Sequence, residues 1–150
     1  MILAFTTTNI LIFYCAFEAV LIPTFFLIGV FGSSSTRVPA SYRLVLFTTV
    51  GSVLILLAII LLYSAVGSLN FWDLRIFLLE NSRLQLIILP LLFFGFGFKI
   101  PFFPVYLWLT SAHVEAPTSG SMILASLMLK LGVYGLLRFC FHLCPEGLFY

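Results

Sequence analysis

The sequence predicts an all-α, polytopic membrane protein with about four transmembrane helices, arranged as a single transmembrane unit over residues 1–150. Hydrophobic residues make up 63% of the chain and charged residues only 8%. A soluble domain of this length cannot hide that much apolar surface, so the membrane is the expected solvent. The long apolar runs favour helices, because backbone groups in lipid need partners within their own segment.

Charge and cysteine usage exclude several other classes of protein. The formal net charge is +2, which is too small to suggest a nucleic-acid partner. The three cysteines form no disulfide framework, and the spacing Cys140-x-His142-x-Cys144 is a poor metal site, because cysteines in apolar spans usually only pack. We therefore predict no metal site. The N-terminus carries Glu18 where a signal peptide would be apolar, so we expect no secretory signal.

The first span is expected over about residues 2–30. Its one charged residue is Glu18, and helical spacing places Thr7, Tyr14 and Glu18 on one face. That face should point into protein. Glu18 is then either a structural carboxylate bonded to a neighbouring helix or a proton-carrying group. Pro23 falls in the last third of this span, where a kink is tolerated.

A polar turn over about residues 31–42 and a second span over about 44–63 follow. Arg37 and Arg43 lie near the turn without a neighbouring acid, which places the turn on the negative side of the membrane. The second span carries a polar patch at helical spacing, which either packs helices together or holds water. The patch consists of Thr48, Thr49 and Ser52.

The longest loop, residues 64–83, contains an apolar stretch suited to a short helix in the membrane interface. Trp72 would sit at the level of the lipid headgroups, where tryptophan is enriched. Arg75 and Arg83 lie in the same loop and weaken the charge difference between the two sides of the membrane.

The third span, over about residues 84–111, is expected to be a broken helix. Pro101 and Pro104 each remove a backbone N–H donor, so the break should fall near Lys99, with a second helical piece at 102–111. Broken spans occur where backbone is buried in protein or lines a wet cavity, and they recur at ion sites. A lysine in apolar surroundings is costly, which points to ion or proton movement.

The fourth span is expected over about residues 118–142. Ser126 and Lys130 are separated by one helical turn and share a face. Arg138 lies near the far end, where its side chain can reach the interface. We expect the spans around Glu18 and Lys130 to be continuous helices, in contrast to the third.

Two strings in the chain resemble a known family. FYCAFEAVLIPT and KIPFFPVYLWLTSAHVEAPTSGSMILASLMLKLGVYGLLR are similar to the antiporter-like, proton-channel subunits of respiratory NADH:ubiquinone oxidoreductase (complex I), subunit 4 in particular. The resemblance implies an ion pair between Glu18 and Lys99. We predict that the carboxylate and the ammonium lie within about 4–6 Å of each other, directly or through one water. It also implies that Lys130 continues the proton path. The subunit would thus belong to an enzyme complex and contribute one proton half-channel.

The chain departs from the family pattern at two positions. Tyr106 stands where the family usually has an in-path histidine, and Thr110 stands where it usually has proline. His113 matches the histidine of the turn. A tyrosine relays protons poorly at neutral pH because its hydroxyl titrates near 10. His113, Tyr106 and Ser126 are therefore only candidate relays between the two lysines.

The resemblance also implies what surrounds the chain. The chain corresponds to about the fifth to the eighth span of a longer subunit. We therefore expect either that a second chain completes a split subunit or that this sequence is part of a longer one. Further expected partners are other membrane-arm subunits and membrane lipids. No cofactor is expected in this chain; NADH, FMN, iron–sulfur clusters and ubiquinone would lie elsewhere in the complex. The expected location is the mitochondrial inner membrane or, alternatively, a bacterial plasma membrane.

Two alternative functions fit the same residues. Subunits of multi-chain sodium/proton antiporters share these motifs, and a structural fragment of complex I that does not pump protons would keep them in part. Co-purification with flavin and iron–sulfur subunits would separate complex I from an antiporter. Retained pumping after loss of Lys99 would favour the structural fragment.

Overall fold

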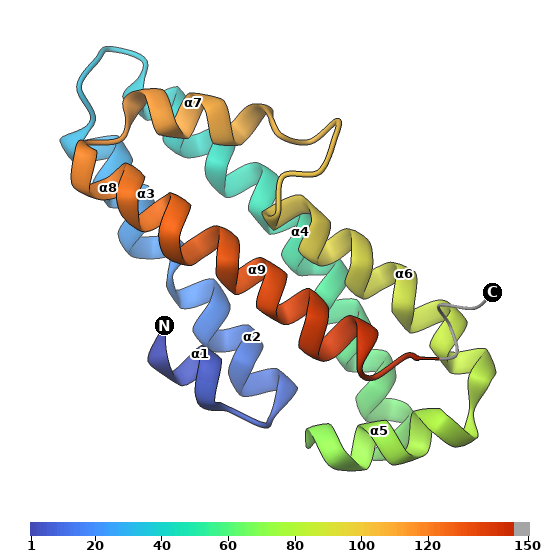
Figure 1. Cartoon of the computed structure of the whole chain (residues 1–150). Coiled ribbons are helices and arrows are strands. Elements are labelled where there is room, and N and C mark those ends of the chain that lie inside the picture. The colour runs from blue at the N-terminus through green and yellow to red at the C-terminus, as the bar shows by residue number, and fades with distance from the viewer. Residues whose placement is uncertain (146–150) are drawn as a thin grey trace.

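The computed structural model describes residues 1–145, and this part of the chain is built of helices without a β-sheet. Helices long and apolar enough to cross a membrane cover four segments, Ile10–Phe31, Arg37–Val66, Ser82–Lys99 and Thr118–Phe141. They confirm the predicted all-α, polytopic architecture. Figure 1 shows the long helices side by side in one bundle, with the short helix α5 (Phe71–Glu80) across one end.

The N-terminal residues form a helix of their own, so the prediction of one helix from residue 2 to residue 30 is wrong. α1 (Ile2–Thr6) is followed by a turn, and α2 (Ile10–Ala19) begins after it. Asn9 caps α2, because its side-chain oxygen accepts a hydrogen bond from the backbone N–H of Leu11 at 2.9 Å. Thr7 lies in the turn and does not share a helical face with Glu18.

The first span is also interrupted just after Glu18, against the expectation of a continuous helix. α2 ends at Ala19 and α3 (Leu21–Phe31) begins after Val20. Pro23 explains the interruption, since it has no N–H to donate to the carbonyl of Ala19. The hydroxyl of Thr24 donates to the Leu21 carbonyl at 2.9 Å and reinforces the first turn of α3.

The second span is longer than expected. α4 runs over Arg37–Val66, so the polar turn ends at Thr36 and the predicted start at residue 44 is wrong. Pro39 falls in the first turn of α4, where a missing N–H leaves no helical bond unmade. Arg37 donates to the carbonyls of Val30 and Gly32 and so caps the end of α3.

The loop after α4 contains the predicted short helix, α5. Its buried side chains are Phe71, Leu74 and Leu78, whereas Trp72 is exposed. The backbone N–H of Phe71 donates to the Thr8 carbonyl at 2.9 Å, which fastens α5 to the turn before α2. The turn before α2 and α5 therefore lie at the same end of the bundle (Figure 1).

The third span breaks at the residue that the proline pattern indicated. α6 runs over Ser82–Lys99, and helix resumes only at α7 (Leu107–Glu115), five residues later than the predicted position 102. Both helices pack against α4. The two pieces thus follow α4 one after the other, with the non-helical residues 100–106 between them (Figure 1).

The fourth span has no gap from Thr118 to Phe141, as expected, but it is not a regular α-helix. Two α-helical pieces, α8 (Thr118–Ile123) and α9 (Leu129–Gly135), alternate with two π-helical ones, η1 (Leu124–Met128) and η2 (Leu136–Phe141). π-Helical turns inside a helix are rare and often mark functional sites. No pattern in the sequence predicted them.

Close packing between α4 and α6 depends on two glycines. A Cβ atom on Gly51 would lie 2.7 Å from the carbonyl oxygen of Gly95, and one on Gly95 would lie 2.6 Å from a side-chain carbon of Ile55. The two backbones therefore touch, as small residues allow in membrane bundles.

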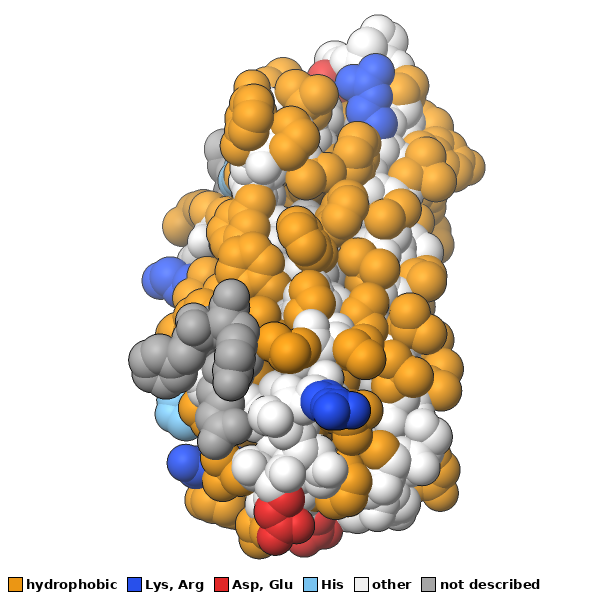
Figure 2. Space-filling model, turned by 90° about the vertical axis from the view of Figure 1, so that its right-hand side faces the viewer, with side chains coloured by type: hydrophobic (Ala, Val, Ile, Leu, Met, Phe, Trp, Pro, Cys, Tyr) orange, Lys and Arg blue, Asp and Glu red, His pale blue; other side chains and the backbone are white. Residues whose placement is uncertain are grey.

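Figure 2 shows hydrophobic side chains over the middle of one face of the molecule and acidic side chains only near its ends, as expected for a bundle in lipid.

Candidate functional site

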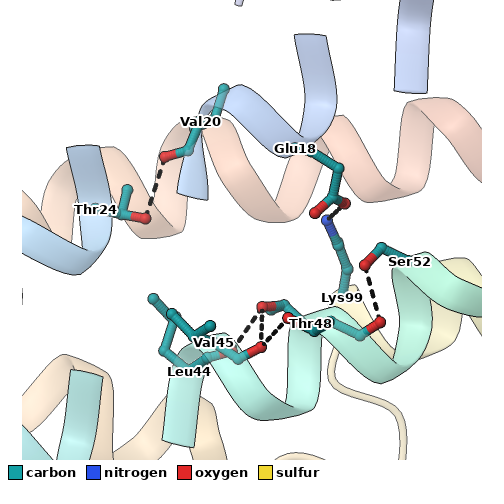
Figure 3. Close-up of polar contacts among 9 residues, drawn as sticks. Glu18, Val20, Thr24, Leu44, Val45, Thr48, Ser52 and Lys99 are labelled. Atoms are coloured by element: carbon teal, nitrogen blue, oxygen red, sulfur yellow. Dashed lines mark hydrogen bonds and ion pairs between the residues drawn. The ribbon is translucent and has the colours of Figure 1, made fainter. Parts of the chain in front are cut away.

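The predicted pair of Glu18 and Lys99 is present as an ion pair. Lys99 Nζ donates to Glu18 Oε1 at 2.5 Å, from the end of α6 to the end of α2 (Figure 3). It is the only ion pair in the part of the chain that the structure describes. The two side chains differ in burial: Lys99 is 6% exposed and Glu18 is 25% exposed. The carboxylate can therefore reach solvent or a neighbour more easily than the ammonium.

Both partners of the pair lie beside a helix break. Lys99 is the last residue of α6, and Glu18 is the last but one of α2. The C-terminal end of a helix carries partial negative charge, which favours the ammonium of Lys99 there. The same partial charge, at the end of α2, disfavours the carboxylate of Glu18. Glu18 therefore depends on the ion pair more than Lys99 does. Glu18 is the partner held less firmly.

Aromatic side chains complete the surroundings of Lys99. Its ammonium lies 3.8 Å from the ring centre of Phe17, a cation–π contact. Trp108 of α7 donates from Nε1 to the carbonyl of Phe98 at 3.1 Å, across the break in the third span. This bond pairs one of the carbonyls that the end of α6 leaves without a helical partner. Trp108 was not predicted as a site residue, because no local pattern links it to Phe98.

A cavity of about 10 Å³ lies against Lys99. That volume is just enough for one water molecule. Thr48 of α4 and Val20 at the α2–α3 break line it from one side, and Met128 and Leu131 of the fourth span line it from another. The cavity therefore lies between the α2–α3 break, Lys99 and the fourth span.

The polar patch of the second span is mostly satisfied within its own helix. Thr48 donates to the Leu44 carbonyl at 2.6 Å, and Ser52 donates to the Thr49 carbonyl at 2.9 Å (Figure 3). Hydroxyls bonded in this way can still accept a hydrogen bond from water. Only Thr48 also lines the cavity beside Lys99. Of the two interpretations, helix packing and water binding, these bonds favour packing for most of the patch. Only the Thr48 hydroxyl is positioned to bind a water in the cavity.

Lys130 and Ser126 do share a face, but that face points away from the cavity. Both residues are exposed on the fourth span, Ser126 within η1 and Lys130 in the first turn of α9. Met128 and Leu131 stand between this face and Lys99. The described residues therefore leave the face of Lys130 uncovered.

The other two candidate relays lie apart from Lys99. Tyr106 is 42% exposed, and its ring stacks on that of Phe103 with the ring centres 6.3 Å apart. His113 lies in the last turn of α7 and is partly buried. Neither side chain lines the cavity beside the lysine. The structure thus does not bring these residues together with the ion pair.

One carboxylate that the sequence did not single out is held firmly at the end of α7. Glu115 is buried and accepts hydrogen bonds from Ser34 and Thr36, both at 2.6 Å. These bonds lower the pKa of Glu115 below its ordinary value of 4.5. They tie the broken third span to the turn between α3 and α4.

Among the described residues, no group of three or more His, Cys, Asp or Glu could hold a metal ion.

Comparison with known proteins gives three kinds of match. Residues 7–149 match the family model described as NADH:quinone oxidoreductase/Mrp antiporter, TM. The chain is 48% identical over its whole length to NADH-ubiquinone oxidoreductase chain 4 of Prototheca wickerhamii, of which it covers 28%. It is 47% identical to NADH-quinone oxidoreductase subunit M of Rickettsia conorii, with 95% of this chain and 29% of that protein covered.

A solved structure has the same fold. One chain in the structure of respiratory complex I from Thermus thermophilus with bound NADH superposes with a TM-score of 0.83 and 32% identity. The match covers 96% of this chain and 31% of that one. The chain thus spans less than a third of the length of the relatives that it matches.

Proposed function

The chain belongs to the NADH:quinone oxidoreductase/Mrp antiporter transmembrane family, and from this membership we propose that it is part of the proton-translocating subunit 4 in the membrane arm of complex I. Relatives named as chain 4 or subunit M of that enzyme support this assignment. The observation that carries the mechanism is the ion pair of Lys99 and Glu18, made between two helix breaks.

The proposed mechanism is charge coupling at Lys99. While the Glu18 carboxylate lies 2.5 Å away, it offsets the cost of holding an ammonium out of water. When Glu18 turns toward its more exposed side, the ammonium loses that partner and releases its proton more readily. The cavity beside Lys99 has room for one water to accept it. Return of Glu18 favours uptake of the next proton.

Lys130 is proposed to take the proton onward, with Ser126 one turn before it on the same face. A lysine exposed on a transmembrane helix would face lipid at a cost of several kcal/mol, about 2.5–3.5 on insertion scales. We therefore propose that further protein covers this face in the assembled subunit and carries an acidic or basic side chain next to Lys130. That protein would be the remainder of the subunit or a second chain that completes it.

Tyr106 and His113 have a smaller place in the proposal. Neither lines the cavity beside Lys99, so the step out of that cavity would pass along water and not through either ring. They would act as relays only together with groups outside this chain.

The proposed setting follows from the relatives. The chain would lie in the mitochondrial inner membrane or a bacterial plasma membrane, among other membrane-arm subunits and lipids. NADH, FMN, iron–sulfur clusters and ubiquinone would be bound by other subunits, and their redox chemistry would drive the movement of Glu18.

Purification of the assembly that contains this chain tests the assignment. The chain carries an affinity tag, the membranes are extracted in mild detergent, and co-purifying proteins are identified by mass spectrometry. Flavin and iron–sulfur subunits of an NADH dehydrogenase are the expected partners. Recovery of antiporter subunits without redox proteins would reject complex I in favour of the sodium/proton antiporter. A tagged, unrelated protein with a similar number of spans serves as the control for non-specific recovery.

A further inference from the structure

A second cavity, of about 480 Å³, opens at the end of the bundle where α5 meets the last turns of the fourth span. Arg75 of α5 and Arg138 of η2 both line it. His142 and the exposed Trp72 also contribute to its wall. This cavity is separate from the one beside Lys99, and the proposed proton path does not use its residues.

The guanidinium of Arg138 is held in place by aromatic neighbours. It donates to the hydroxyl of Tyr134, whose own hydroxyl donates to the Phe5 carbonyl at 2.9 Å. The guanidinium carbon also lies 5.6 Å from the ring centre of Phe71 and 5.7 Å from that of Phe139. These contacts fix the orientation of the group and use only part of its hydrogen-bonding capacity, since arginine has five N–H donors.

The positive charge in this cavity is not neutralised within the described chain. Neither Arg75 nor Arg138 lies within 4.0 Å of a carboxylate there. The nearest acid along α5 on the N-terminal side of Arg75, Asp73, accepts a hydrogen bond from Ser68 at 2.7 Å and does not line the cavity. Two arginines in a concave site, without an acidic partner among residues 1–145, create a local attraction for anions.

We propose that this cavity binds the phosphate of an anionic phospholipid headgroup. Arginine is well suited to phosphate because its planar group can offer two parallel N–H donors. Basic pockets between transmembrane helices bind anionic headgroups, and the position of Trp72 agrees with the interface level of such groups. The inference does not depend on the proposed proton path.

An apolar track beside the cavity favours a lipid over a free phosphate. Leu137 lines the cavity and is 49% exposed, and Val133, one turn earlier on the same face, is 39% exposed. The track leads from the two arginines over one turn of the fourth span and ends before Lys130, whose face further protein is proposed to cover. An acyl chain attached to a headgroup in the cavity would lie along it, whereas inorganic phosphate would gain nothing from it.

Lipid retention by the whole chain tests the inference. The chain is reconstituted into bilayers of phosphatidylcholine with and without phosphatidylglycerol and extracted in mild detergent, and retained lipid is counted by native mass spectrometry. Retention of phosphatidylglycerol in preference to phosphatidylcholine is expected. Arg75→Gln should weaken that retention about fivefold, the effect of roughly one basic residue near a headgroup. Arg138→Lys, which keeps the charge but not the planar group, should weaken it less.

Arg83→Gln is the matched control, because Arg83 is an exposed arginine near α5 that does not line the cavity. It should leave retention unchanged. Arg75→Gln carries the test even if substitutions at Arg138 disturb the fold, since the side chain of Arg75 is not part of the aromatic contacts. Equal retention of the two lipids, an equal effect of Arg83→Gln, or equally tight binding of inorganic phosphate would overturn the proposal.

Discussion

Glu18 and Lys99 should contribute unequally to stability although they form one pair. Removing one partner of a buried pair typically costs about 3–5 kcal/mol, because the other charge remains unpaired in a poorly solvated site. In Glu18→Gln the charge left behind belongs to Lys99, which is 6% exposed, and the cost should approach the lower end of that range. In Lys99→Met it belongs to Glu18, which is 25% exposed, and the cost should be smaller because water reaches it.

A double-mutant cycle measures this asymmetry. The free energy of unfolding in mild detergent is followed by helix content for the two single variants and for the double variant Glu18→Gln/Lys99→Met. The double variant should recover much of the loss, with a coupling energy of about 1–3 kcal/mol. Gln in place of Glu18 and Met in place of Lys99 keep the side-chain volumes close to the original. Purely additive effects, or a larger loss in Lys99→Met than in Glu18→Gln, would refute the reasoning from burial.

Two further predictions concern packing and pH. Gly51→Ala should destabilise the chain by about 1–3 kcal/mol, because its Cβ would lie 2.7 Å from the Gly95 carbonyl oxygen. Leu57→Ala, on the exposed side of α4, is the control in the same unfolding assay. Equal destabilisation by the two substitutions would contradict the prediction. Because the pKa of Glu115 is lowered, its stabilisation of α7 is complete above pH 4.5 and is lost as the pH falls below that value. Lower hydrogen-exchange protection of α7 at low pH, measured relative to the intrinsic exchange rate at each pH, checks this prediction; Glu115→Gln should show no such change with pH.

The break at Lys99 could be predicted from sequence because its cause is local. Pro101 and Pro104 follow the lysine directly, and a helix ends before such residues. The break after Glu18 has a similar local cause in Pro23, but a single proline within a transmembrane span predicts only a tolerated kink. The start of α2 at Asn9 also has a local cause, since asparagine is a preferred capping residue at the start of a helix.

The face of Lys130 could not be predicted in the same way. Spacing shows that Ser126 and Lys130 lie on one face, but in a membrane both the core-facing and the lipid-facing sides of a helix are apolar. Periodicity therefore lacks the contrast that orients a helix in a soluble protein. The bonds of Glu115 to Ser34 and Thr36 join residues about 80 positions apart, so they depend on the packed bundle and leave no local signal.

Proton pumping by the assembled enzyme with Lys99→Met tests the proposed role of the ion pair most directly. Membrane vesicles containing the purified complex are supplied with NADH and a quinone, and proton uptake is measured per NADH oxidised. A variant at Arg83, which is exposed and outside the pair, controls for assembly. We predict a lower ratio of protons to NADH in Lys99→Met than in the control, with the subunit still present in the complex. An unchanged ratio would contradict a proton path through Lys99 and leave the chain as a structural part of the membrane arm.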